Sequence, residues 1–360
     1  MKVLHVISTL ETGGAQKFVG ELLPLLNKKP DIDIKLLTFK SSGSDIEKNL
    51  KESGVEIVSL ETPIHSLSLV SKLKPFLREA DLVHAHLFPT NYFVAIANIG
   101  INKPLFFTEH STHNRRRDHK WLRPIEKYIY NRYRKIVCIS YATKTSLDKW
   151  LHYKPSNQKS IVIENGVDLS RFNRDIKVDS QKIFGRKGIP ILMISRFTAS
   201  KDHPTLLRAI KEIVNPEVFA VLVGDGELRP EIEKLARDLG IEDRVLFLGT
   251  RSDIPEIISA AKIGVQSSNW EGFGLTAVEM MAGGLPVIAS NVEGLKQVVE
   301  GAGILFEKGD FKHLSELIKQ LINNSELNSE IKQLQLNRVN AYKIERTVVN
   351  HISQYTGQKE

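Results

Sequence analysis

The sequence has almost no cysteine. Cys138 is the only one among 360 residues, so no disulfide can form within the chain, and a reducing compartment suits it. This cysteine lies in the apolar run 136–140, where a small buried side chain is a commoner role than a nucleophile. No apolar run approaches the ~20 residues of a membrane-spanning helix, and residues 1–10 are too short and too polar for a signal peptide. We therefore expect a cytoplasmic protein, at most peripheral on the inner face of the cytoplasmic membrane.

Two motifs are also missing, and each absence argues against a kind of chemistry. No complete G-x-G-x-x-G fingerprint occurs, either at Gly13-Gly14 or at 224–226, which argues against a nicotinamide enzyme. No suitable loop carries a D-x-D pair of acids, although Asp225 and Asp253 are left as possible individual metal ligands. We expect metal-independent chemistry and no cofactor.

One histidine pair has a spacing that metal sites use. His84 and His86 lie two residues apart in the predicted strand 82–86, so their side chains share one face. Such a pair can bind zinc, but no third ligand cluster is evident in the sequence. We expect packed or cleft-lining side chains here and no bound metal.

The chain does contain a repeated alternation of short apolar segments with helix-length amphipathic ones. The β-branched runs cover 3–8, 32–39, 56–60, 82–86, 105–110, 135–140 and 160–166, and then 191–197, 218–226, 245–250, 263–268 and 286–290. This alternation is typical of parallel, doubly wound sheets. Since the pattern restarts after the polar join 165–181, and 360 residues exceed one usual core, we predict an α/β protein with two Rossmann-like domains, 1–166 and 167–342.

Two glutamates with seven residues between them, Glu271 and Glu279, are the most informative feature. The segment between them contains Gly272, Phe273, Gly274, Leu275 and Thr276. A glycine-rich turn that leads into a helix presents free amides and a positive dipole end, which suit a phosphate. Glu279 would lie one turn after Leu275 on the same helix face, where its carboxylate can accept from a ligand hydroxyl such as those of ribose.

Two cations follow the predicted strand 191–197. Arg196 and Lys201 are five residues apart, so both can reach a pyrophosphate, the first through its planar guanidinium and the second as a point charge. In open α/β sheets ligands bind beyond the carboxyl ends of strands. These charges would stabilise a diphosphate leaving group.

The segments EGFGLTAVE (271–279) and MAGGLPVIAS (281–290), with the cations above, resemble the retaining, nucleotide-sugar-dependent glycosyltransferases of family 4, also called glycosyl transferases group 1. The resemblance implies a GT-B architecture, in which two Rossmann-like domains face each other across a cleft. It also implies that the first domain (1–166) binds the acceptor and is joined by the C-terminal helix 343–360, and that 167–342 binds the donor. Asn165-Gly166-Val167-Asp168 resembles the interdomain segment of that family.

The resemblance further implies the roles of individual residues. The Gly13-Gly14 loop is similar to the family's GGAE loop, with Gln16 in place of the usual glutamate, and Thr108-Glu109-His110 is similar to its T-x-H segment, whose histidine reaches the donor sugar. The catalytic residues would be Glu271, His110, Arg196 and Lys201. The donor-binding residues would be Gly13, Gly14, Arg196, Lys201, Gly272, Phe273, Gly274, Leu275, Thr276 and Glu279, with Gly249 and Arg251 near the nucleobase.

The charge distribution bears on the acceptor. Net charge is +8, and residues 113–135 hold nine Lys or Arg against Asp118 and Glu126. Interleaved aromatic residues, Trp121, Tyr128, Tyr130 and Tyr133, would let this surface rest on anionic headgroups, although a solvated basic helix explains the charge equally well. No nucleic-acid module is present.

The sequence thus predicts a retaining glycosyltransferase that moves a sugar from a nucleotide sugar, in our interpretation a UDP-sugar, to a saccharide or lipid-linked acceptor in surface polysaccharide or glycolipid synthesis. Two alternatives remain open at this point. One is a nucleotide-sugar 2-epimerase of the same architecture, and the other is a non-catalytic subunit that binds nucleotide sugars.

Overall fold

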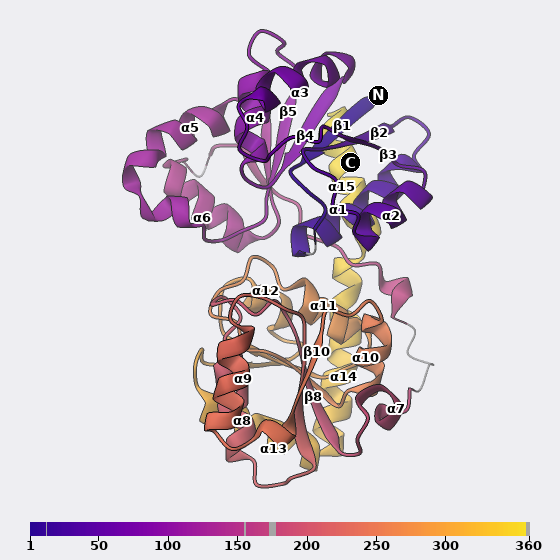
Figure 1. Cartoon of the computed structure of the whole chain (residues 1–360), viewed down its shortest axis with the longest axis vertical. Coiled ribbons are helices and arrows are strands. Elements are labelled where there is room, and N and C mark those ends of the chain that lie inside the picture. Colours follow the sequence, from indigo (N-terminus) through magenta and orange to yellow (C-terminus); the bar gives the residue numbers. More distant parts are fainter. Residues whose placement is uncertain (12, 155, 173–177, 358–360) are drawn as a thin grey trace. The chain divides into compact units, whose positions relative to one another are not determined.

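The computed structural model describes residues 1–11, 13–154, 156–172 and 178–357. The chain divides into two compact units, Met1–Asp168 with Ile344–Glu360, and Leu169–Lys343. Each unit is one parallel sheet with helices on both faces (Figure 1). The predicted pair of Rossmann-like domains is confirmed.

The first unit contains a seven-stranded sheet in the order β3-β2-β1-β4-β5-β6-β7. Its strands are β1 (Lys2–Ile7), β2 (Asp33–Thr38), β3 (Glu56–Ser59), β4 (Leu82–His86), β5 (Leu105–Glu109), β6 (Lys135–Cys138) and β7 (Ser160–Val162). Its α-helices are α1 (Gly14–Asn27), α2 (Asp45–Glu52), α3 (Ser68–Glu79), α4 (Thr90–Ala97), α5 (Arg123–Asn131), α6 (Tyr141–Leu151) and α15 (Ile344–Thr356). The strand order reverses between β1 and β4, which are direct neighbours, so the loops after these two strands flank the point where α/β folds bind ligands.

The second unit repeats this topology with six strands, in the order β10-β9-β8-β11-β12-β13. Its strands are β8 (Ile189–Ile194), β9 (Val218–Val223), β10 (Val245–Gly249), β11 (Ile263–Gln266), β12 (Val287–Ser290) and β13 (Ile304–Phe306). Its α-helices are α7 (Ser180–Phe184), α8 (His203–Glu212), α9 (Arg229–Asp238), α10 (Ile254–Ala260), α11 (Leu275–Ala282), α12 (Leu295–Val299), α13 (Phe311–Asn323) and α14 (Ser325–Val339). The reversal falls between β8 and β11. All twelve predicted strands are present, and β13 was not predicted.

The last helix belongs to the first unit. In Figure 1 the yellow α15 runs beside α1, and the two helices are in contact. The amide of Ile344 donates to the carbonyl of Val167 (3.1 Å), and the Thr347 hydroxyl donates to the carbonyl of Glu164 (2.9 Å). Gly166 lies so close to the start of this helix that an added Cβ would be 2.4 Å from the Ile344 Cα.

The basic segment 113–135 is not one continuous helix. Two 3₁₀ turns, Arg115–Asp118 and Lys120–Leu122, precede α5. Tyr130 and Tyr133 are each only 1% exposed, so the expectation that they face a membrane is wrong. Their hydroxyl groups have partners inside the unit: Tyr130 donates to the buried carboxylate of Glu109 (2.9 Å), and Tyr133 donates to a backbone carbonyl (2.6 Å).

Candidate functional site

The two predicted phosphate and sugar contacts of the second unit meet where its strand order reverses. Lys201 follows β8, Glu271 follows β11, and their side chains form an ion pair. The two loops are also joined through their backbones, since Asn269 donates its amide N–H to the carbonyl of Ser200 (2.8 Å) and its side-chain amide to that of Ala199 (2.8 Å). The structure therefore brings together two residues that are 70 positions apart in the sequence.

The glycine-rich turn leads into α11 as the sequence predicts. Gly274 precedes the helix with a φ of 96°, a left-handed conformation that favours glycine, and the helix begins at Leu275 and Thr276. Phe273 is buried against Tyr342, with ring centroids 5.4 Å apart. This aromatic contact fixes the turn, so the amides at the start of α11 are held in place.

Glu271 and Glu279 differ in their surroundings. Glu271 is half-buried, and its Oε1 accepts from the Gly272 amide (3.2 Å). Glu279 is only 3% exposed, one turn into α11. Glu279 lies one turn beyond the start of α11, the end of the helix at which we predict the donor.

Arg196 is exposed directly after β8, on a loop held by the turn 224–226. Phe197 donates its amide to the carbonyl of Asp225 (3.1 Å), and its carbonyl accepts from Leu228 (3.0 Å). An added Cβ on Gly226 would lie 2.5 Å from the carbonyl oxygen of Phe197. The turn 224–226, which lacks the complete dinucleotide-binding motif, thus supports the loop that carries Arg196.

Gly294 also supports the site, and we did not predict it. It follows β12, the neighbour of β11, and an added Cβ would lie 2.5 Å from the carbonyl oxygen of Glu271. The backbone of this loop therefore packs directly on the Glu271–Gly272 peptide. The strand-end rule would have pointed to this residue, since it lies in the loop after the predicted strand 286–290.

The residues predicted near the nucleobase lie at the end of β10. Gly249 has a φ of 66°, and Arg251 forms an ion pair with Asp253 that includes a 2.7 Å hydrogen bond. That hydrogen bond lowers the pKa of Asp253. Asp225 likewise pairs with Arg229 (3.3 Å). Both acids that stayed open as stray metal ligands are thus engaged by arginines.

In the first unit, Gly13 precedes α1 and Gly14 begins it. His110 comes directly after β5, with its ring 6.0 Å from Phe18 and 5.8 Å from His86 between centroids. Burial and repulsion from His351 lower the pKa of His110 to about 3, so its ring is neutral near pH 7. Its Nε2 atom has no hydrogen-bond partner among the described residues.

His84 and His86 do share a face, with parallel rings 4.5 Å apart. Both are fully buried, which supports packing and not exposure to a cleft. A third histidine lies beside them: His5 pairs in register with His84 and stacks on both rings. His5 could not be predicted as the third member from the sequence, because its position beside His84 depends on the pairing of β1 with β4.

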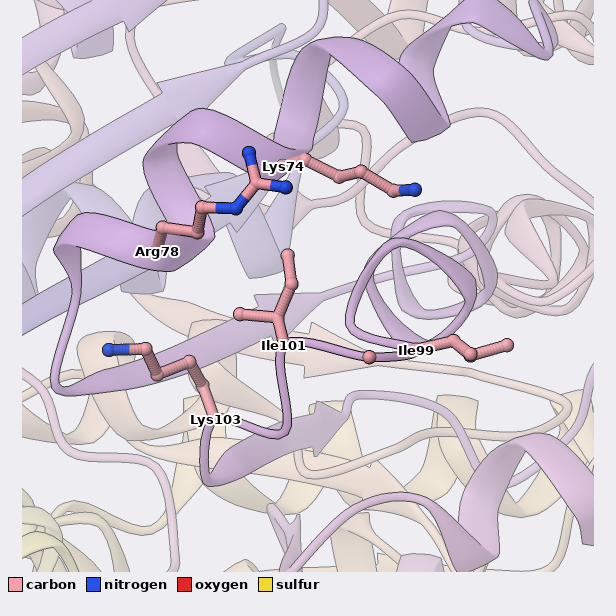
Figure 2. Close-up of a pocket in the computed structure, with 6 residues that line it drawn as sticks. Lys74, Arg78, Ile99, Ile101 and Lys103 are labelled. Atoms are coloured by element: carbon pink, nitrogen blue, oxygen red, sulfur yellow. The ribbon is translucent and has the colours of Figure 1, made fainter.

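A pocket of about 420 Å³ lies elsewhere in the first unit. Figure 2 shows Lys74 and Arg78 on α3, with Ile99, Ile101 and Lys103 in the segment that leads to β5. This pocket lies where a strand begins, whereas the predicted site residues follow strand ends. None of the predicted site residues lines it.

Among the described residues, no helix combines the length and the apolar character needed to cross a bilayer.

Two Rossmann-like sheets, each with a strand-order reversal, define the GT-B class of proteins. A family model described as Glycosyltransferase Family 4 matches residues 12–171, and one described as Glycosyl transferases group 1 matches residues 175–335. The chain is 30% identical to an uncharacterized glycosyltransferase of Methanocaldococcus jannaschii over 84% of each chain. It belongs to this glycosyltransferase family and is a transferase enzyme.

Two further relatives extend the comparison. The chain is 28% identical to a UDP-Gal:alpha-D-GlcNAc-diphosphoundecaprenol alpha-1,3-galactosyltransferase of Escherichia coli, over 97% of this chain and 95% of that protein. Its fold is similar to that of Anabaena Alr3699/HepE crystallised with UDP and glucose, with a TM-score of 0.88 and 22% identity over 99% of this chain and 100% of the other.

Proposed function

We propose that this glycosyltransferase moves a sugar from a UDP-sugar to a lipid-linked saccharide, with retention at the anomeric carbon, in the synthesis of a surface polysaccharide or glycolipid. The observation that carries the donor side is the Lys201–Glu271 ion pair at the strand-order reversal of the second unit. Support for UDP comes from the Escherichia coli relative, whose name gives UDP-Gal as donor, and from the Anabaena structure, which contains UDP.

The proposed donor site binds the diphosphate through both positive charge and hydrogen bonds. Arg196 and Lys201 neutralise the diphosphate, and the amides at the start of α11 bind its oxygens. The negative charge on the leaving diphosphate grows as the glycosidic bond breaks, so these groups stabilise the transition state more than the ground state. These two cations supply charge that a divalent metal would otherwise provide, and we propose that transfer needs no metal or other cofactor.

Glu271 and Glu279 have separate roles in this proposal. Glu279 accepts from the ribose hydroxyls, since it is buried one turn inside α11. Glu271 hydrogen-bonds the donor sugar and also holds Lys201. A donor diphosphate competes with Glu271 for the Lys201 ammonium group, so binding of nucleotide and release of this carboxylate are coupled. His110 stays a predicted sugar contact from the first unit.

The acceptor proposal rests on an exposed surface of α5 and the turn before it. Trp121, Ile125 and Tyr128 are 70%, 48% and 58% exposed. Ile125 and Tyr128 are three residues apart on one side of α5, and Trp121 belongs to the 3₁₀ turn just before that helix. Lys120 and Lys127 are exposed beside them. We propose that these five residues rest on the inner face of the cytoplasmic membrane, where a polyprenyl-linked acceptor would be found.

Thermal unfolding with UDP, GDP and ADP tests the donor proposal. A ligand at 100 times its dissociation constant adds about 2.7 kcal/mol, so we expect UDP to raise the melting temperature of the second unit by several degrees. Glu279→Ala should weaken this shift, whereas Lys319→Ala, on the exposed face of α13, should leave it unchanged. Absence of a shift with every nucleotide in folded wild-type protein would remove the basis of the proposal.

Turnover separates the two glutamates. We expect Glu271→Gln to lower kcat and Glu279→Gln chiefly to raise KM for the donor, because only the first contacts the reacting sugar. Wild-type kinetics in both variants would contradict the assignment. Product analysis without acceptor distinguishes transfer from 2-epimerisation, and NMR of the product's anomeric proton reports retention.

Vesicle flotation tests the acceptor surface. Binding to vesicles that contain anionic lipid should fall on Trp121→Ser, while Leu67→Ser is the control, since Leu67 is also highly exposed (82%) but lies outside this surface. Equal flotation of the two variants would place membrane contact elsewhere, and no binding at low salt would exclude it.

A further inference from the structure

A cluster of histidines occupies the interior of the first unit and has no part in the proposed donor chemistry. His5 on β1, His84 and His86 on β4, and His351 on α15 are each at most 1% exposed. Their rings stack, with centroids 5.2 Å apart for His5 and His86 and 5.8 Å apart for His84 and His351. Four buried imidazoles in contact are unusual for a core, since each contains two polar nitrogens that need partners.

The nitrogen atoms of three of these rings converge. One ring nitrogen from each of His5, His84 and His86 lies within 4.8 Å of the other two. Imidazole nitrogens in a tetrahedral zinc site are about 3.3 Å apart, given Zn–N bonds of about 2.0–2.1 Å. The three ring planes lie within 23° of parallel, so the rings must turn before all three nitrogens point at one ion.

The hydrogen bonding of these rings is incomplete within the described part of the chain. His5 Nδ1 and His86 Nε2 are 2.9 Å apart, so one donates to the other, but His5 Nε2 and His86 Nδ1 have no partner among the described residues. A buried polar atom without a partner costs about 1–3 kcal/mol. The cluster as it stands therefore carries an energetic cost.

A hydrogen bond within α15 fixes the tautomer of His351 in a form that can bind a metal. Its Nδ1 lies 2.9 Å from the carbonyl oxygen of Thr347, and because a carbonyl only accepts, Nδ1 must bear the proton. Nε2 then has a free lone pair, and it is buried without a partner. A histidine whose second nitrogen donates to a backbone carbonyl has the usual arrangement of a metal ligand.

The hydrogen-bond partners of His84 suit it both with and without a bound cation. Its Nδ1 is 2.6 Å from the Tyr355 hydroxyl and its Nε2 is 2.7 Å from the Thr108 hydroxyl. A hydroxyl both donates and accepts. His84 can therefore turn one nitrogen to a cation while the other keeps its hydrogen bond.

We propose that His5, His84 and His86 bind one late first-row divalent cation, for which Zn²⁺ is the natural candidate, and that His351, whose ring is 5.8 Å from that of His84 between centroids, turns toward them as the fourth ligand. A set of neutral imidazoles suits Zn²⁺, Co²⁺, Ni²⁺ and Cu²⁺ and is unsuited to Mg²⁺ or Ca²⁺, which prefer oxygen ligands. The ion is structural: it joins β1 and β4 to the C-terminal helix α15, next to His110. It takes no part in binding the donor diphosphate, which we place in the other unit.

Metal content of the full chain tests this proposal. The protein is produced without a polyhistidine tag in zinc-supplemented medium, because the site is buried and fills most readily during folding. After gel filtration we expect about one zinc ion per chain by elemental analysis, and less than about a tenth of that in His5→Gln/His86→Gln. His203→Gln is the matched control, since His203 is also buried (2% exposed) but lies in the second unit, and it should retain the zinc.

Cobalt gives a second measurement that needs no variant. Wild-type protein produced with Co²⁺ should show the intense visible absorption of tetrahedral cobalt. Zinc content at the buffer level, content unchanged in the double variant, or cobalt protein without this absorption would each overturn the proposal. If the double variant does not fold, the cobalt spectrum of the wild type decides. None of these results depends on whether the chain uses a UDP-sugar, so failure here is distinct from failure of the proposed function.

Discussion

Gly294→Ala should damage the donor site without contacting any ligand. The added methyl group would lie 2.5 Å from the Glu271 carbonyl oxygen and 2.9 Å from the carbonyl carbon of the same residue. Both neighbours are backbone atoms, so no side-chain rotation relieves the clash. The Glu271–Gly272 peptide or the loop after β12 must move by about 0.9 Å to restore an ordinary contact of about 3.4 Å.

The size of the effect follows from this displacement. Forcing an extra methyl group into a packed region costs about 1–3 kcal/mol, which lowers the melting temperature of a unit of this size by about 2–4 °C for each kcal/mol. A reacting group misplaced by about 1 Å can lose about 100-fold in rate. Because Glu271 moves with its peptide, we expect turnover to fall far more than stability.

The assay combines calorimetric titration of UDP with donor turnover and a melting curve. Lys296→Ala is the matched control in the same segment, since Lys296 is exposed and contacts only the Glu300 carboxylate (3.6 Å) among the ion pairs of the described residues. Turnover within about twofold of wild type in Gly294→Ala, with Lys296→Ala also unaffected, would show that the Glu271 peptide does not position the reaction.

Three further predictions concern stability. Gly166→Ala should lower the calorimetric melting temperature of the first unit, because the added Cβ would meet the backbone of Ile344 at 2.4 Å and push α15 outward; an unchanged transition would contradict this packing. Glu126→Gln should cost about 3–5 kcal/mol in urea unfolding, since it leaves the Arg116 guanidinium, 2.6 Å away, without its buried partner; a loss under about 1 kcal/mol would show that this pair is solvated. Burial and repulsion from Lys201 lower the pKa of His203 from 6.5 to about 4. As the pH falls, the unfolded chain therefore takes up this proton before the folded chain does, and the free energy of unfolding of the second unit falls by about 2 kcal/mol between pH 7.5 and pH 5. His203→Phe should remove that part of the pH dependence in denaturant titrations, and an unaltered pH profile would mean that His203 is protonated in the folded state.

The sequence predicted which residues of the second unit lie together at the candidate site because the signals for their positions are local. Strand ends can be recognised from apolar runs, and in a parallel sheet the residues that follow adjacent strands come together. Lys201 and Glu271 are an example: neither is informative alone, but each follows a strand next to the strand-order reversal. The three-residue β13 was missed because so short a run shows no periodicity.

What could not be predicted depends on contacts between distant segments. His5 joins His84 only through the register of β1 with β4, and His351 is added by a helix from the far end of the chain. The basic neighbours of Tyr130 led us to predict that it faces a membrane surface. Two buried carboxylates, Glu109 and Glu126, instead draw Arg117 and Arg116 inward and leave Tyr130 in the core.

The two units share one topology but differ in the charge of the side chains beside the strand-order reversal. This difference supports donor binding by one unit and acceptor binding by the other. Beside the strand-order reversal of the second unit, an arginine, a lysine and a glutamate lie exposed or half-buried. In the first unit the rings beside the reversal are His5, His84 and His86, fully buried, with pKa values lowered by burial so that they are neutral near pH 7. A diphosphate needs positive charge. The neutral histidines of the first unit do not provide it, whereas the arginine and lysine of the second unit do. UDP should therefore raise the unfolding temperature of the second unit alone, and stabilisation confined to the first unit would reverse our assignment of donor and acceptor domains.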